Sequence, residues 1–307
     1  MHSRLSPHYH PSTGPRDFGE LILASGRLWL ASLRFIWREA LLASFLPVLP
    51  LLLWWWSKRS RFDGAVPEAW LDPGLWQFDA FGLVLTLTTN ILGLGFWLII
   101  MQRQGLLARG LGDQIQGAES AWRHLPQALV ASVSYTVLML LALAPVGVAA
   151  WFGSVGEEPI LALLYLLIGL LLATVPLTWV SIAAVFIYPP ILLDRCGGLA
   201  AQKWSFRLVR GHWVRCAGLL SLTMFTSLGL LGTVGALPFA LTGIAAFAEA
   251  GPDALLRPGW LVFGQLLSTP FAAVCLPLAT AGYMVCYEDL RWRQPGMINP
   301  ESTGPTG

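Results

Sequence analysis

The stretch that decides the fold is Ile160–Leu193, ILALLYLLIGLLLATVPLTWVSIAAVFIYPPILL, which contains no Asp, Glu, Lys or Arg. A helix needs about 20 apolar residues to cross the hydrocarbon core of a bilayer, which is about 30 Å thick. Five further charge-free blocks of similar character are Ala40–Trp56, Ala80–Gln102, Pro126–Phe152, Cys216–Ala248 and Trp260–Tyr287. They lack the ten-residue alternation of barrel strands, and a helix satisfies its own backbone in lipid. The sequence therefore predicts an all-α, polytopic integral membrane protein with six transmembrane helices.

The composition agrees with this fold class. Mean hydropathy is +0.63, 55% of residues are hydrophobic and 12% are charged, which is too little charge for the surface of a soluble domain. The net charge of +2 indicates no nucleic-acid partner. We expect one membrane domain over 17–293, with disordered cytoplasmic tails at 1–16 and 294–307. The first tail is rich in His, Pro and Ser and lacks the apolar core of a signal peptide.

The basic residues predict the topology. Fifteen of the 19 Lys and Arg residues fall before the first predicted span or after an even-numbered one. By the positive-inside rule, both termini are then cytoplasmic. A basic trio after the first span, Lys58, Arg59 and Arg61, favours the opposite side and leaves the orientation of that span open.

The segment Leu199–Gly211 has the pattern of an amphipathic helix in the headgroup plane. Its cations, at i, i+4 and i+7 spacing on one face, are Lys203, Arg207 and Arg210. Its second face carries Ala201, Trp204 and Leu208. The three cations and Trp204 form a candidate lipid-headgroup site, for which anionic phospholipid is the expected partner. Simple anchoring of the topology, without lipid selectivity, is the alternative.

Within the spans, two amides are candidate polar sites. Asn90 and Gln265 are costly to leave unpaired in lipid, and they could face a shared polar cavity. Packing against a neighbouring helix is the alternative. Prolines are expected to break several spans into short, irregular helices, and Tyr188-Pro189-Pro190 should distort the end of the fourth.

Catalytic signatures are missing from the sequence. The spans hold no charged or histidine side chain of the kind that coupled transporters use. Neither H-E-x-x-H nor G-x-S-x-G nor a phosphate-binding G-x-x-x-x-G-K-[ST] loop occurs. His124 and His212 have no acid or nucleophile partner nearby in sequence. Four cysteines without a C-x-x-C pair, and the tail histidines His2, His8 and His10, make no recognisable metal site. We expect neither catalysis nor a cofactor.

Two patches carry a resemblance to a known family. The linker Tyr188-Pro-Pro-Ile-Leu-Leu-Asp194, followed by Ala201-Gln-Lys-Trp-Ser-Phe-Arg-Leu-Val-Arg-Gly-His-Trp213, resembles that of YciC-like bacterial inner-membrane proteins. The closing Tyr287-Glu-Asp-Leu-Arg-Trp-Arg293 is similar to the family's Tyr-x-Asp-Leu-Arg-x-Arg pattern. That family is related to the membrane domain of some glycerophosphodiester phosphodiesterases. The resemblance implies a six-helix inner-membrane protein, but this chain lacks clustered metal carboxylates, so phosphodiesterase activity is not carried over.

The closing segment has its own charge pattern. On a helix, Glu288 can pair with Arg291 at i+3 and Asp289 with Arg293 at i+4, and docking of these acids against Lys203, Arg207 or Arg210 is the alternative.

The sequence leaves two function hypotheses open. The leading hypothesis is a non-catalytic protein of envelope organisation or maintenance, as the membrane subunit of a larger assembly. The rival is an uncoupled transporter or lipid-handling carrier with a cavity near Asn90 and Gln265. A continuous polar path between the helices would favour the carrier, and a solid apolar interior would favour the organising protein.

Overall fold

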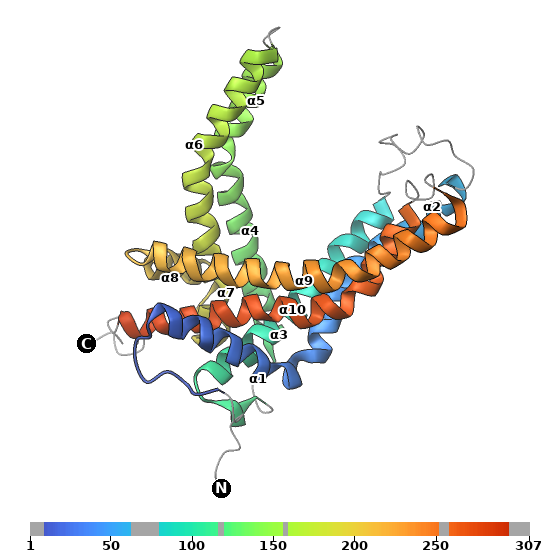
Figure 1. Cartoon of the computed structure of the whole chain (residues 1–307). Helices are drawn as coiled ribbons and strands as arrows, with labels where there is room; N and C mark the ends of the chain where they lie inside the picture. Colours follow the sequence, from blue (N-terminus) through green and yellow to red (C-terminus); the bar gives the residue numbers. More distant parts are fainter. Residues whose placement is uncertain (1–8, 63–79, 116–119, 156–158, 252–257, 295–307) are drawn as a thin grey trace.

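The computed structural model describes residues 9–62, 80–115, 120–155, 159–251 and 258–294, and within these ranges it contains helices and no strand (Figure 1). Six helical stretches in the described part are long and apolar enough to cross a membrane: Phe18–Ser57, Ala80–Ala108, Ala121–Ala142, Ile160–Leu193, Trp213–Glu249 and Gly259–Arg293. The predicted fold class is confirmed.

The structure consists of α-helices and short 3₁₀ turns in the described part. The described elements are α1 (Phe18–Phe45), the 3₁₀ turn η1 (Leu46–Val48), α2 (Leu49–Phe62), α3 (Ala80–Ala108), η4 (Gly112–Gln114), η5 (Ala121–His124), α4 (Leu125–Ala142), α5 (Ala144–Val155), α6 (Pro159–Val185), α7 (Tyr188–Leu193), α8 (Gly198–Val209), α9 (Trp213–Ala250) and α10 (Pro258–Arg293). The break at residues 186–187, before Tyr188-Pro189-Pro190, confirms the predicted distortion.

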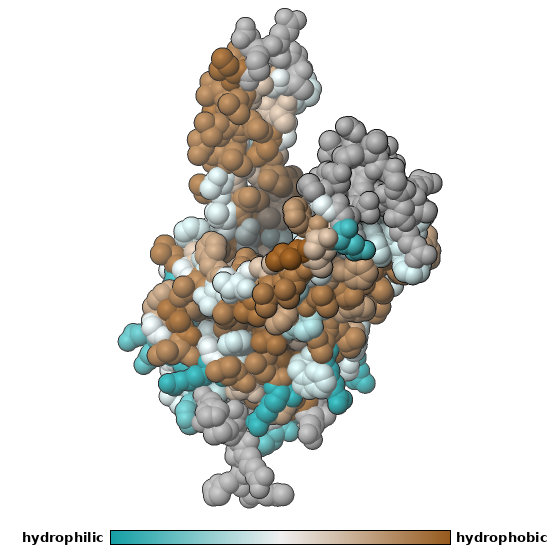
Figure 2. Space-filling view, turned by 45° about the vertical axis from the view of Figure 1, so that its right-hand side comes forward, coloured by the Kyte–Doolittle hydropathy of each residue, from teal (hydrophilic) through white to brown (hydrophobic). Residues whose placement is uncertain are grey.

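The helices form two units. One is a bundle in which α10 packs along both α9 and α1, while α3 packs against α1 and α10. The other is a hairpin in which α4 and α5 run up and α6 returns; this hairpin rises away from the bundle (Figure 1). Hydrophobic residues cover the hairpin and much of the body, and hydrophilic residues gather at the opposite, lower end (Figure 2). The charged groups that hold the helices together lie at that end.

The first helix begins much earlier than its apolar block. The sequence placed the span at Ala40–Trp56, whereas α1 begins at Phe18. Its buried positions include Leu21, Leu28 and Ile36, while its charged residues lie between them on other faces. A helix with one apolar face continues through charged residues because their side chains remain outside the core.

The prediction of short helices is wrong for the last two spans. α9 has 38 residues and α10 has 36. At 1.5 Å per residue, α9 extends about 57 Å, which exceeds the roughly 40–45 Å of a whole bilayer, so it must tilt, bend or extend beyond the lipid. α10 continues through Pro270 and Pro277. Side chains of neighbouring helices donate to its carbonyls; the described donors and their acceptors are Trp29 to Val274 O (2.8 Å), Ser227 to Cys275 O (3.1 Å), Gln104 to Pro277 O (3.0 Å) and Thr242 to Trp260 O (3.3 Å).

The amino-terminal segment differs from the expected tail. Residues 1–8 lie outside the described part, but Tyr9–Arg16 run as a strap across the base of the bundle. Tyr9 is only 6% exposed and belongs to the main core cluster. The backbone nitrogen of Arg16 donates to Asp289 Oδ1 at 2.8 Å. At the other terminus, Gln294 bonds Leu208 O at 3.2 Å, and residues 295–307 lie outside the described part.

Candidate functional site

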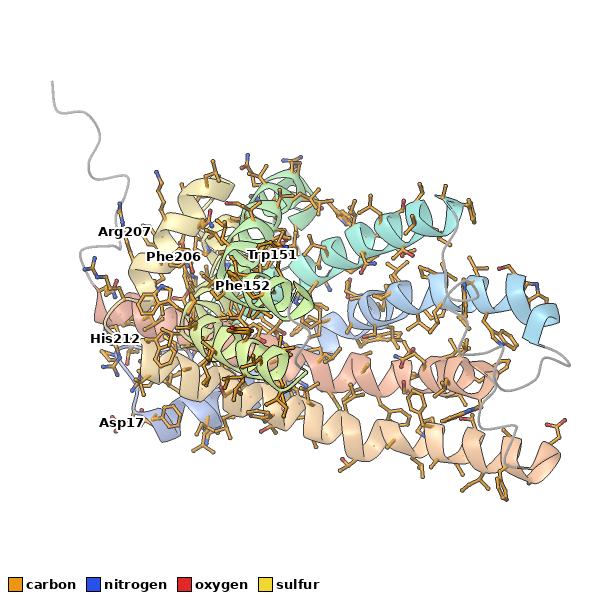
Figure 3. All side chains as sticks on the ribbon, turned by 90° about the horizontal axis from the view of Figure 1, so that it is seen from above. Asp17, Trp151, Phe152, Phe206, Arg207 and His212 are labelled. Atoms are coloured by element: carbon orange, nitrogen blue, oxygen red, sulfur yellow. The ribbon has the colours of Figure 1, made fainter. Side chains whose placement is uncertain are left out.

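Helix α8 forms where the amphipathic pattern predicted it. It covers Gly198–Val209, and Arg210 follows in an extended conformation. Lys203, Arg207 and Arg210 are all exposed, and none makes an ion pair with a described acidic residue. Seen from above, Arg207 lies at the outer margin of the molecule (Figure 3). The three predicted cations therefore share an outward surface, which we call the α8 cationic face.

The inward side of α8 joins the two units. Ala201 packs in the cluster at the foot of the hairpin, with Ala131 and Ile191, whereas Leu208 packs in the bundle core. Polar contacts reinforce the hairpin side: Gly198 N donates to Gln127 Oε1 (2.9 Å) and Ser134 Oγ donates to Gln202 Oε1 (2.7 Å). The α8 cationic face is thus carried by a helix that links hairpin and bundle.

Trp204 lies on the packed side of α8. It is half-buried against the bundle core, and its indole Nε1 is buried without a hydrogen-bond partner in the described part. In this arrangement its side chain packs α8 against the bundle core. Lipid contact by this residue stays a prediction.

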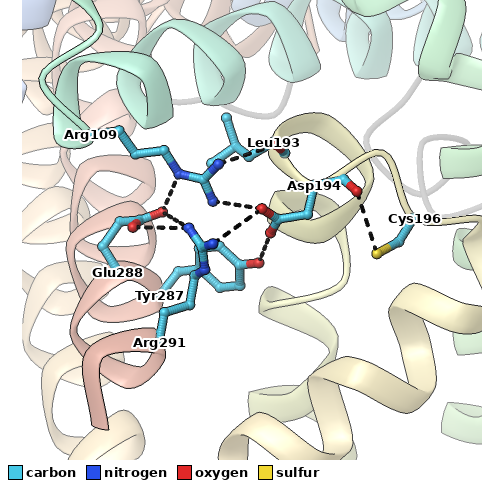
Figure 4. Close-up of polar contacts among 7 residues, drawn as sticks. All are labelled: Arg109, Leu193, Asp194, Cys196, Tyr287, Glu288 and Arg291. Atoms are coloured by element: carbon cyan, nitrogen blue, oxygen red, sulfur yellow. Dashed lines mark hydrogen bonds and ion pairs between the residues drawn. The ribbon is translucent and has the colours of Figure 1, made fainter. Parts of the chain in front are cut away.

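A partly buried ring of charges lies beside α8 and brings together residues of the two patches of the resemblance (Figure 4). Arg109 Nε lies 2.7 Å from Glu288 Oε1, and Arg109 Nη2 lies 3.0 Å from Asp194 Oδ1. Arg291 bridges the same two acids, at 3.3 Å from Glu288 Oε2 and 3.5 Å from Asp194 Oδ1. The Tyr287 hydroxyl donates to Asp194 Oδ2. We call these five residues the ionic ring.

Asp289 anchors a second group of contacts next to the ring. It is 1% exposed and accepts from the Nε atoms of Arg215 and Arg293, each at 3.0 Å, as well as from the backbone of Arg16. The carbonyl of Arg16 in turn accepts from both of these guanidinium groups. The carboxylate therefore holds the strap, the start of α9 and the end of α10 in one place.

The acids of the closing segment form the predicted pairs within α10 and also contact arginines elsewhere in the chain. The pairs Glu288–Arg291 (3.3 Å) and Asp289–Arg293 (3.0 Å) are confirmed. The acids also dock against other helices, but their partners are Arg109 on α3 and Arg215 on α9. The alternative prediction, that these acids dock against Lys203, Arg207 or Arg210, is wrong, because those cations are exposed and make no described ion pair.

Two groups near the ring have raised pKa values. Burial alone would lower the pKa of Arg109, but the charges of Glu288 and Asp194 outweigh it and raise the pKa, so the guanidinium stays charged. Burial raises the pKa of the Cys196 thiol, and the negative charge of Asp194 raises it further. The thiol is therefore a weak nucleophile at neutral pH.

After the ion pairs described above are counted, several exposed cations in the described part remain without an ion pair. In the described part, Glu39, Asp194, Glu288 and Asp289 are all engaged by arginines. The α8 cationic face has no such partner, and α1 adds further exposed cations without a described ion pair: Arg27, Arg34 and Arg38. Among the described residues, these six exposed cations outnumber the exposed acids Asp17, Glu20 and Asp113, which also lack an ion pair, and this excess favours anionic partners.

The two predicted intramembrane amides are not equivalent. Asn90 is exposed on α3, and its amide donates to its own helix at Thr86 O (2.7 Å). Gln265 is half-buried on α10. The amide that the sequence reasoning missed is Gln104, which is fully buried and donates to Ser32 Oγ (3.1 Å) and Pro277 O. Its place at the polar end of α3, next to Arg103, was the only signal in the sequence.

The arrangement offers no reactive centre among the described residues. No group of three His, Cys, Asp or Glu side chains comes together that could hold a metal ion. His124 and His212 sit at the starts of α4 and α9, on separate elements. A cavity of about 290 Å³ adjoins the ionic ring, but its charged lining residues, Arg109, Glu288 and Arg291, are already engaged in the ion pairs of the ring, which Asp194 completes. The ring is suited to holding helices together.

Comparison of the sequence and the structure with protein-family models, curated proteins and solved structures returned no match. The proposed function therefore rests on the residues of this chain and their contacts.

Proposed function

We propose that the chain is a non-catalytic inner-membrane protein of bacteria that binds anionic phospholipid through α8 and helps to organise or maintain the envelope. Both termini and α8 lie in the cytoplasm in this proposal. The observation that carries it is the α8 cationic face: exposed cations without described ion pairs, on a helix whose other side links the hairpin to the bundle.

The charge supports an anionic lipid as the partner. Because α8 packs its apolar side into the protein, it meets lipid through its exposed cations, which attract anionic headgroups. Each Lys or Arg near an anionic surface contributes about 1 kcal/mol, so the three cations together contribute about 3 kcal/mol, or roughly a hundredfold in affinity.

The position of α8 supports an organising role. A helix that packs against both units, with Ala201 toward the hairpin and Leu208 toward the bundle, fixes their relative placement. Lipid held on its outer side would tie that placement to the membrane surface. A membrane-protein partner, in a larger assembly, would then bind a body of defined shape. Membership in the YciC-like family is part of this proposal and rests on the two patches of sequence.

The carrier hypothesis has less support. Asn90 is exposed and bonded to its own helix, so it does not line a buried path with Gln265. The described core between α1, α3, α9 and α10 consists mainly of Leu, Ala, Met and Cys side chains. A solid interior of this kind favours the organising protein.

The test is lipid retention. The protein is extracted in native lipid, and the lipids that remain bound are identified by mass spectrometry. The variant Lys203→Gln/Arg207→Gln/Arg210→Gln should retain much less anionic lipid, while the charge-preserving control Lys203→Arg/Arg207→Lys/Arg210→Lys should retain the wild-type amount. Equal retention by all three proteins would contradict the proposal and leave α8 as a topology anchor. The same experiment identifies any co-purifying membrane protein.

A further inference from the structure

The strap is fixed at both ends and leaves a cavity between them. Tyr9 is buried in the core at one end, and Arg16 is bound to Asp289, Arg215 and Arg293 at the other. Between these anchors, the strap and the first turns of α1 enclose a cavity of about 500 Å³. Pockets of roughly 300–1,000 Å³ accommodate small molecules. The walls are held by contacts that exist without any ligand, so the cavity is preformed.

The lining of this strap cavity is largely polar and carries two guanidinium groups and one carboxylate. Its polar side chains are His10, Ser12, Thr13, Arg16, Glu20 and Arg27. The Arg16 guanidinium is held in position, because it donates to His10 O at 2.8 Å and lies 5.7 Å from the centre of the Tyr9 ring. Arg27 is exposed and has no described acidic partner.

The one acid in the cavity is already engaged. The Glu20 carboxylate accepts from Asp17 N at 3.2 Å, as part of the capping box that begins α1. A carboxylate in the first turn is also partly balanced by the positive end of the helix. Two guanidinium groups therefore dominate the charge available to a ligand.

We propose that the strap cavity binds a phosphate ester, with Arg27 as its main contact. The planar guanidinium donates two parallel hydrogen bonds to phosphate oxygens, and the Thr13 hydroxyl adds a donor of ordinary strength, whereas the Ser12 hydroxyl already donates to Gly14 O. Leu23 and Leu30 on α1 are 61% and 59% exposed, so apolar surface adjoins Arg27. The phosphate can belong to a phospholipid headgroup, whose acyl chains would follow these leucines, or to a soluble ester.

The site is separate from the α8 cationic face. It extends the proposed lipid-binding function to a second place on the molecule, and the two sites share no residue. Its test therefore uses variants of α1, with α8 intact. The wild-type protein, Arg27→Gln and Arg34→Gln are compared. Arg34 is the matched control because it is also exposed on α1 but stacks 4.5 Å from the Phe35 ring and does not line the cavity.

Phosphatidylglycerol is titrated into the detergent-solubilised proteins, and bound lipids are counted by native mass spectrometry. Loss of a charged bidentate contact should weaken the tightest-binding lipid by roughly tenfold in Arg27→Gln, and Arg34→Gln should bind like the wild type. Competition by glycerol 3-phosphate would assign the site to soluble esters, and an Arg27-dependent signal without competition would assign it to the headgroup. Equal weakening by both substitutions, or by neither, would overturn the proposal. An Arg27 effect that persists in the triple α8 variant would separate this site from the proposed function.

Discussion

Tyr287 donates its phenolic hydrogen to Asp194, and this bond joins the last turns of α10 to the end of α7. Asp194 also accepts from Arg109 and Arg291, so the carboxylate has three partners from two helices. The ionic ring therefore links the middle of the chain to its end. Ion pairs of this kind stabilise the fold mainly because it costs free energy to leave one member unpaired.

Asp194→Asn should destabilise the protein by about 2 kcal/mol. Removing one partner of a buried ion pair typically costs about 3–5 kcal/mol, and the cost is lower here because the ring is only partly buried and Glu288 still pairs with both arginines. Thermal unfolding in detergent measures the effect. Asp113→Asn is the control, since Asp113 is exposed and has no described ion pair, and its unfolding temperature should equal the wild type's. Equal stability of the two variants would show that the ring does not hold the helices.

Substitution of the two amides should have unequal effects. Gln104→Leu removes two buried hydrogen bonds between helices, to Ser32 Oγ and to Pro277 O, although Pro277 O keeps its bond from Thr280, and the change should cost about 1–3 kcal/mol. Asn90→Leu removes an exposed amide that bonds its own helix and should be close to neutral. The unfolding temperatures of the two variants, measured side by side, check this. If Asn90→Leu is the more damaging change, the polar contact that matters lies at Asn90, as the sequence hypothesis had it.

The sequence predicted what depends on local pattern. Charge-free blocks located the spans, and the i, i+4, i+7 spacing located α8, because lipid burial and helical periodicity are both readable along the chain. The start of α1 was missed, since its charged residues suggested a linker although its buried face continues through Leu21 and Leu28.

Long-range pairing was beyond the sequence. Glu288 had several basic candidates, and only the fold places Arg109 beside it, 179 positions away. The strap was missed for the same reason: its burial depends on Asp289 and on the core around Tyr9, which no local pattern in residues 9–16 indicates.

The topology is tested by labelling single cysteines in a background without the native ones. Lys203→Cys lies on exposed α8, and Glu249→Cys is exposed near the far end of α9. A membrane-impermeant maleimide, applied to cells with an intact cytoplasmic membrane, should label Glu249→Cys and should reach Lys203→Cys only after permeabilisation. This orientation follows from the positive-inside rule, because most of the Lys and Arg residues fall on the side predicted to be cytoplasmic. Labelling of Lys203→Cys in intact cells would invert the topology and remove α8 from the cytoplasmic leaflet.

The most direct test of a lipid-binding, non-catalytic role is complementation. In cells from which the gene has been deleted, the phenotype should be restored by the wild-type protein and by His124→Gln/His212→Gln, since neither histidine contacts an acid or nucleophile in the described part. The variant Lys203→Gln/Arg207→Gln/Arg210→Gln should fail to restore it at equal expression and membrane insertion. Rescue by the α8 variant together with failure of the histidine variant would contradict the account and point to catalysis at one of those histidines.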